Sequence, residues 1–156
     1  MRIGREFGSI GNTMKSPPRI VIDTNVLVSA LRLHAGWSFD LLSRLGQGTY
    51  LHVVTVPLVM EYEDVLLRPG MVPVVETVVQ DVLDYLCATA QQQEVHFLWR
   101  PRLPDVKDDM VLEAAVNGQC QTIVTWNVRD FAAAAEFGIE VVNPHNFLNP
   151  PKGELS

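Results

Sequence analysis

Short runs of apolar, mostly β-branched residues recur along the chain, and helix-forming segments separate them. The runs are 19–23, 50–55, 121–125 and 140–142, and a further strand is possible at 94–98. Runs of this length suit strands that are buried on both faces of a parallel sheet. Strands that alternate with helices predict a three-layer α/β/α fold with a mainly parallel central sheet.

The segments between these runs carry the signals of helix starts and stops. We expect helices over 26–33, 38–45, 57–67, 74–89, 107–117 and 131–137. Pro57 suits the first turn of the helix at 57–67, and Gly118 suits the end of the helix at 107–117. The segment 74–89 places a run of apolar side chains on one side of its helix.

Length and composition indicate one globular domain. The chain has 156 residues, of which 47% are hydrophobic, which fits a single core. We expect a flexible leader or tag at 1–18, the domain at 19–148 and a loose tail at 149–156. No apolar run is long enough to span a bilayer, and the first residues lack a secretory signal, so we expect a cytoplasmic protein. Cys87 and Cys120 have no metal-type spacing and are expected to be free thiols.

The net charge of −6 argues against an ordinary nucleic-acid binder, which usually carries a basic face. A nuclease can still be acidic if its carboxylates gather in one place and hold metal ions.

Asp23 directly follows the first apolar run. Ligands bind outside the carboxyl ends of the strands in open parallel sheets, so Asp23 is placed where a site would form. The alternative is that Asp23 only caps the following helix. We favour the site, because Thr24 and Asn25 offer two further caps.

Glu61 lies at the border of the apolar stripe of its expected helix. Glu63 and Asp64 point the other way, which indicates a solvated face. An acid drawn toward the interior is costly unless a cation or donors satisfy it. The alternative is a buried glutamate bound to the backbone or to an arginine.

Asp108 and Asp109 stand at the expected start of a helix, where acids can simply cap and complement the helix dipole. Asp109 shares a helix face with Leu112, Ala115 and Val116, so its side chain can point toward the buried side of the helix. Asp108 is the preceding residue, one step around the helix, and could assist Asp109 in the site.

The segment 125–131, Thr-Trp-Asn-Val-Arg-Asp-Phe, follows another buried strand. Thr125 and Asn127 therefore lie at a strand's carboxyl end. Asp130 could belong to the same site or could cap the helix that follows; spacing alone leaves both open.

Together, these segments resemble the PIN-domain family, and especially its branch of toxins from bacterial type II toxin–antitoxin pairs. The matching segments, in order, are 21–30 (Val-Ile-Asp-Thr-Asn-Val-Leu-Val-Ser-Ala), Glu61-Tyr62 with 65–69 (Val-Leu-Leu-Arg-Pro), 104–109 (Pro-Asp-x-x-Asp-Asp) with Ala114, and 125–131.

The resemblance implies that Asp23, Glu61 and Asp109 are the family's first three acids and, with Asp108, ligands of a metal ion. Its fourth acid often stands where this chain has Asn127. Asp130, three residues on, could supply the missing carboxylate. Whether the site holds one or two metals therefore stays open.

The implied activity is that of an endoribonuclease that uses Mg²⁺ or Mn²⁺ to hydrolyse RNA phosphodiesters. Crowded carboxylates raise each other's pKa unless a cation neutralises them, which suits such a site. Asn25, Thr125 and Arg129 are the expected substrate contacts. Further candidate phosphate contacts are Arg32, Arg68, Arg100 and Arg102. The implied partners are an antitoxin protein and a second copy of the chain. The apolar residues at 74–86 exceed what one face of a small domain needs, and we expect helices near the N-terminal half at the contact of the homodimer.

Two other functions fit parts of the pattern. A non-catalytic PIN-like interaction module would explain Asn127. An unrelated α/β phosphate-transfer enzyme would also have an acid after its first strand, although Asn25 stands where a phosphohydrolase usually has a second Asp. The sequence has no glycine-rich phosphate loop, no Ser-His-Asp pattern and no Cys/His metal spacing. The histidines are scattered and are expected to be structural or on the surface: His34, His52, His96 and His145.

Overall fold

The computed structural model of the protein describes residues 16–96 and 108–151, and all structural statements below concern these residues. Its five strands form one parallel sheet in the order β3-β2-β1-β4-β5. The strands are β1 (Arg19–Ile22), β2 (Leu51–Val54), β3 (Gln91–Gln92), β4 (Thr122–Val124) and β5 (Glu140–Val142). The predicted parallel sheet is confirmed.

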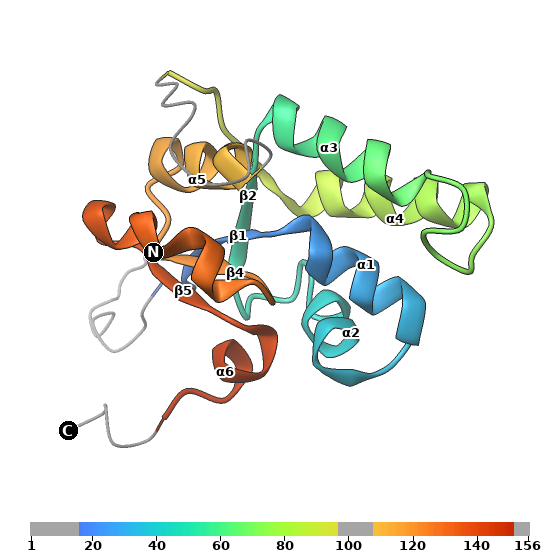
Figure 1. Cartoon of the computed structure of the whole chain (residues 1–156), viewed down its shortest axis with the longest axis horizontal. Coiled ribbons are helices and arrows are strands. Elements are labelled where there is room, and N and C mark those ends of the chain that lie inside the picture. Colours follow the sequence, from blue (N-terminus) through green and yellow to red (C-terminus); the bar gives the residue numbers. More distant parts are fainter. Residues whose placement is uncertain (1–15, 97–107, 152–156) are drawn as a thin grey trace, which may run out of the picture.

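Helices cover the sheet on both sides (Figure 1). They are α1 (Thr24–Leu33), α2 (Gly36–Ser43), α3 (Val56–Leu66), α4 (Glu76–Thr89), α5 (Asp108–Asn117), η1 (Val128–Phe137, a 3₁₀ helix) and α6 (Pro144–Leu148). In Figure 1, α3, α4 and α5 lie above the sheet, and α2 and α6 lie below it. This arrangement is the predicted three-layer α/β/α fold.

The order of the strands creates a switch point beside β1. The chain runs outward from β1 to β2 and β3, then returns past β1 to form β4 and β5 on the other side. β1 and β4 are paired from Ile20↔Thr122 to Ile22↔Val124. Ligands of open α/β sheets bind at such a point, outside the carboxyl ends of the strands.

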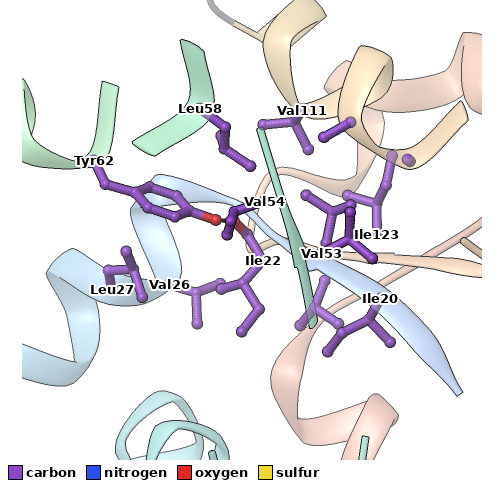
Figure 2. Packing of buried hydrophobic residues seen from close by; sticks show 14 of the residues in the cluster. Ile20, Ile22, Val26, Leu27, Val53, Val54, Leu58, Tyr62, Val111 and Ile123 are labelled. Carbon is purple, nitrogen blue, oxygen red and sulfur yellow. Dashed lines mark hydrogen bonds between the residues drawn. The ribbon is translucent and has the colours of Figure 1, made fainter. Parts of the chain in front are cut away.

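The core is centred on β1, whose Ile20, Val21 and Ile22 are fully buried. Tyr62, also fully buried, reaches from α3 toward the end of β1 (Figure 2). Its hydroxyl donates a hydrogen bond to the backbone carbonyl of Ile22, one residue before Asp23. Tyr62 therefore ties the helix that carries Glu61 to the strand that Asp23 directly follows.

The direction of α5 follows from contacts at its end. The guanidinium of Arg19, at the start of β1, donates from Nε and Nη2 to the carbonyl of Gly118 at 2.9 and 2.7 Å. The end of α5 therefore lies at the amino edge of the sheet. The helix has 10 residues and spans about 15 Å, so it begins toward the carboxyl edge.

One expected strand was wrong. The third strand is β3, paired with Val53 and Val54, rather than 94–98. Residues 94–96 form no strand, and 97–98 lie outside the described residues. The end of α4 lies beside β2, because the Thr89 hydroxyl is 3.2 Å from Nε2 of His52, and Gln91 pairs with Val53 two residues later. An edge position accepts these two exposed glutamines.

The final helix was not predicted from the sequence, although a signal for it was present. Asn143 precedes Pro144, and the Asn143 side chain accepts a hydrogen bond from the Asn146 backbone at 2.7 Å. An asparagine cap followed by proline in the first turn is a recognised helix start.

The apolar side of α4 is divided between the core and the surface. Val79, Leu83 and Leu86 are buried, but Val78 is 40% exposed, and Val75, directly before the helix, is 65% exposed. The two cysteines are free thiols, as expected. None of the helices in the described part of the chain is long and apolar enough to cross a membrane.

We predict that Tyr62→Phe lowers the free energy of unfolding by about 1–2 kcal/mol, because it removes one buried hydrogen bond while keeping the ring. Thermal melts measure the effect. Tyr85→Phe is the matched control: its hydroxyl bonds the Leu45 carbonyl at 3.1 Å, but its side chain is half exposed. Equal losses of unfolding free energy in the two variants would show that the buried hydrogen bond to Ile22 contributes no more than the partly exposed one to Leu45.

Candidate functional site

Asp23 is buried at the junction of β1 and α1, with 6% of its surface exposed. Its Oδ1 accepts a hydrogen bond from the Thr24 backbone at 2.7 Å, and its Oδ2 accepts one from the Thr125 hydroxyl at 2.8 Å. We expected Thr24 or Asn25 to cap the helix, and that was wrong. Helix α1 begins at Thr24, so Asp23 is the cap. Its second oxygen remains directed at β4.

Thr125 is the centre of a hydrogen-bonded group at the ends of β1 and β4. Its Oγ1 donates to Asp23 and accepts from the Asn25 side chain at 3.3 Å and from the Asn127 backbone at 3.0 Å. Asn25 Oδ1 in turn accepts from the Trp126 backbone at 3.3 Å. The structure thus brings together Asp23, Asn25 and Thr125, as the sequence indicated.

The pKa of Asp23 reflects both its burial and the charges of other acids. Burial is the main cause that raises the pKa of Asp23 above its ordinary value. The hydrogen bonds from Thr125 and Thr24 lower this pKa, whereas the charges of Glu61 and Asp130 raise it further. Acids on two other elements, Glu61 on α3 and Asp130 on η1, therefore act electrostatically on Asp23 at the switch point.

Glu61 is half-buried on α3, while Glu63 and Asp64 are exposed, as the helical angle predicted. The start of α3 is fixed by Thr55, whose hydroxyl accepts from the Leu58 backbone at 3.3 Å. Tyr62 then anchors the next turn to β1. These two contacts direct the Glu61 position toward the end of β1.

Asp109 is 1% exposed in the first turn of α5, and Asp108 is half-buried beside it. The direction of α5 places both acids toward the carboxyl edge of the sheet. The rest of the expected motif, 104–107, lies outside the described residues.

Asn127, Arg129 and Asp130 are exposed just past β4. Helix η1 begins at Val128, after Asn127, so Asp130 is inside the first turn. The helix is interrupted at Phe131, whose backbone angles are not helical, so Asp130 directly precedes the part of η1 that covers the expected helix at 131–137. Both roles of Asp130, in the site and as a cap, therefore stay predictions. Residues 126–130 line a hollow of about 370 Å³.

Sequence reasoning did not single out Trp126 or Ser38. The Trp126 indole Nε1 donates to the Ser38 hydroxyl on α2 at 2.8 Å. The only signal for Trp126 was its place between Thr125 and Asn127. Nothing in the sequence indicated Ser38, because the contact joins residues 88 positions apart.

Several expected surface or phosphate-binding residues have other contacts. Arg32 donates to the Met71 carbonyl at 2.8 Å, and Arg68 pairs with Asp64 at 2.8 Å. Arg100 and Arg102 lie outside the described residues.

His52 is buried, and its Nε2 lies 3.2 Å from the Thr89 hydroxyl. Burial lowers the pKa of His52 to about 4, which fits a structural histidine.

Within residues 16–96 and 108–151, no three His, Cys, Asp or Glu side chains converge into a ready-made metal-binding group. The donor chemistry nevertheless suits Mg²⁺, which prefers oxygen ligands and is commonly held by one or two carboxylates together with water and substrate phosphate. A cation here would also offset the repulsion that raises the pKa of Asp23.

The fold and site define an α/β protein with a buried acidic centre at the switch point of a parallel sheet. A family model described as PIN domain matches residues 19–129, and the chain belongs to the PIN-domain family. Members of this family are generally nucleases and typically use divalent metal ions. None of the curated proteins matches the chain.

A solved structure has a similar fold. It is the crystal structure of VapBC2 from Rickettsia felis bound to a DNA fragment from their promoter. The TM-score is 0.56 at 14% sequence identity, and the match covers 80% of this chain and 98% of that chain.

The raised pKa of Asp23 predicts a pH-dependent difference between the protein and its Asp23→Asn variant. Between the unfolded and folded pKa values, the native state binds more protons than the unfolded state, so rising pH costs the wild type stability. Below the unfolded pKa this cost is absent, and above the folded pKa it is complete. The variant should therefore gain stability relative to the wild type as the pH rises through the folded pKa.

Thermal melts in EDTA across the acidic to neutral range measure this difference. Asp64→Asn, which neutralises an exposed acid on α3, is the control and should show no such gain. A stability difference between wild type and Asp23→Asn that stays constant with pH would contradict the prediction.

Proposed function

We propose that this protein is a metal-dependent endoribonuclease, and that it is the toxin of a toxin–antitoxin pair. The observation that carries the proposal is the buried Asp23 carboxylate at the switch point of a PIN-domain sheet, whose pKa is raised by burial and by the charges of Glu61 and Asp130. A buried acid with a raised pKa is costly to the fold, and such perturbed acids are typical of functional sites.

In the proposed site, Asp23 and Asp109 hold Mg²⁺ or Mn²⁺, and Glu61, Asp108 and Asp130 assist directly or through water. A divalent cation bound there would lower the pKa of a water and neutralise charge on the phosphate. The cation also offsets the electrostatic objection of a net charge of −6, because it lies between acidic protein and anionic RNA.

The chain's own residues position the reacting groups. Thr125 and the Thr24 backbone hold the Asp23 carboxylate in one orientation. Asn25 and Asn127 add neutral amides at the strand ends, which suits contact with substrate without further negative charge. Arg129 is exposed beside them and is proposed to contact a phosphate.

An antitoxin partner is proposed because the similar solved structure is a VapBC2 complex. A homodimer is proposed as well. Apolar side chains stand exposed on α3 and before and within α4: Val56 at 70%, Met60 at 63%, Val75 at 65% and Val78 at 40%. Such residues favour association, and a stable interface buries about 1,600 Å² in total.

A second candidate is a non-catalytic interaction module. Asn127, in place of a frequent fourth acid, favours it. A site that has lost catalysis should bind Mn²⁺ poorly, so calorimetric titration separates the two functions.

We predict that the protein cleaves RNA with Mg²⁺ or Mn²⁺, and that cleavage stops in EDTA. Asp23→Asn should reduce cleavage to the level of the metal-free reaction, because it removes a charged ligand while keeping the side-chain shape. Gel assays on single-stranded RNA measure both effects. Asp64→Asn is the control and should cleave like the wild type. Cleavage that survives thorough chelation would refute the proposed mechanism.

Asn127 and Asp130 give a sharper test. If Asp130 supplies the missing carboxylate, Asp130→Ala should weaken Mn²⁺ binding and cleavage with little change in melting temperature, because its side chain then serves the metal ion and not the helix. Asn127→Asp should then change Mn²⁺ affinity little. Calorimetry and thermal melts measure these quantities. A lower melting temperature for Asp130→Ala, with unchanged Mn²⁺ affinity and cleavage, would contradict this role.

A further inference from the structure

Trp126 is an exposed tryptophan held at one edge. Its side chain follows Thr125 and is 40% exposed. Its indole N–H donates to the hydroxyl of Ser38, which is only 2% exposed. The polar edge of the ring is thus bound to a buried group, and part of its apolar surface remains in solvent. An indole needs no such exposure if its role is to fill a core.

The indole is also connected to the acidic centre. The Trp126 backbone N–H donates to Asn25, the Asn25 amide donates to Thr125, and Thr125 donates to Asp23. Hydrogen bonds at both the backbone and the side chain therefore set the position of the ring relative to the Asp23 carboxylate. A binding surface whose geometry is fixed before binding loses little conformational entropy.

The surroundings of Trp126 suit a nucleotide. Residues 126–130 line a hollow of about 370 Å³, so Trp126, Asn127 and Arg129 border one space. Asp130 borders it as well, and its carboxylate is the one proposed to assist the metal ion. An aromatic surface next to a cationic group is the combination that binds single-stranded nucleic acid, with the ring under a base and the cation near the phosphate.

We propose that Trp126, oriented by Ser38, is the platform on which an unpaired base of the substrate stacks beside the acidic centre. This inference rests on the proposed nuclease function and adds a substrate requirement to it. A base can stack on a side chain only when it has left its own helix, so the enzyme selects RNA that is unpaired next to the cleaved bond. Every base has a π-face, so Trp126 provides affinity for single strands and little sequence preference.

The test measures kcat and KM for cleavage of a labelled single-stranded oligoribonucleotide in Mn²⁺, together with its binding by fluorescence anisotropy. Trp126→Ala should lower kcat/KM and weaken binding by about 5- to 150-fold, the range for one lost base–aromatic stack. Trp126→Leu should behave like Trp126→Ala, because it restores apolar bulk without a π-face. Trp126→Phe should retain more binding than Trp126→Leu.

Two comparisons make the test specific. Tyr85→Ala removes another exposed aromatic ring whose tip is hydrogen-bonded to the protein, but on α4, and should leave kcat/KM unchanged. The same oligoribonucleotide annealed to its complement should be a poor substrate for the wild type. In Trp126→Leu, the kcat/KM values for the single strand and the duplex should lie closer together than in the wild type. Thermal melts of each variant exclude loss of fold as the cause.

The possible outcomes separate the two proposals. A wild type that does not cleave RNA refutes the proposed function, and this inference with it. A wild type that cleaves, with Trp126→Ala and Trp126→Leu equal to Tyr85→Ala, refutes the stacking role alone. In that case the exposed indole is a contact for a protein partner or has no binding role.

Discussion

The Asp23 carboxylate lies buried between the ends of β1 and β4, and the hydrogen bond from Thr125 joins the two strands there. Burying an acid costs free energy that its donors only partly offset. The neighbouring charges of Glu61 and Asp130 add to the cost. The fold therefore keeps an electrostatically unfavourable group at the switch point between β1 and β4, where the order of the strands reverses. A cation and an anionic substrate would relieve that repulsion.

Hydrogen bonds outside this centre set the positions of the elements that carry its residues. Tyr62 ties α3 to β1 through the Ile22 carbonyl, Arg19 ties the end of α5 to the start of β1, and Ser38 holds the indole of Trp126. None of these residues carries the proposed chemistry. Each one limits where a neighbouring functional residue can lie, so the precision of the site depends on packing outside it.

The sequence predicted the parallel sheet, the acids at strand and helix ends, and the inward direction of Asp109. These features depend on local patterns, since apolar runs and helical angles are set by neighbouring residues. Sequence reasoning failed at the edge strand β3, whose two glutamines carry no strand pattern and pair only because α4 ends beside β2. It also assigned the cap of α1 to the wrong residue.

By itself, the sequence determined which residue types stand at the carboxyl ends of β1 and β4, because the periods of strand and helix place them there. Only the tertiary structure decided that Asp23 bonds Thr125 across 102 positions, that Asp130 lies inside a helical turn, and that Ser38 holds Trp126. Such contacts depend on how separate elements pack, and no local pattern encodes the distance between residues so far apart in the chain.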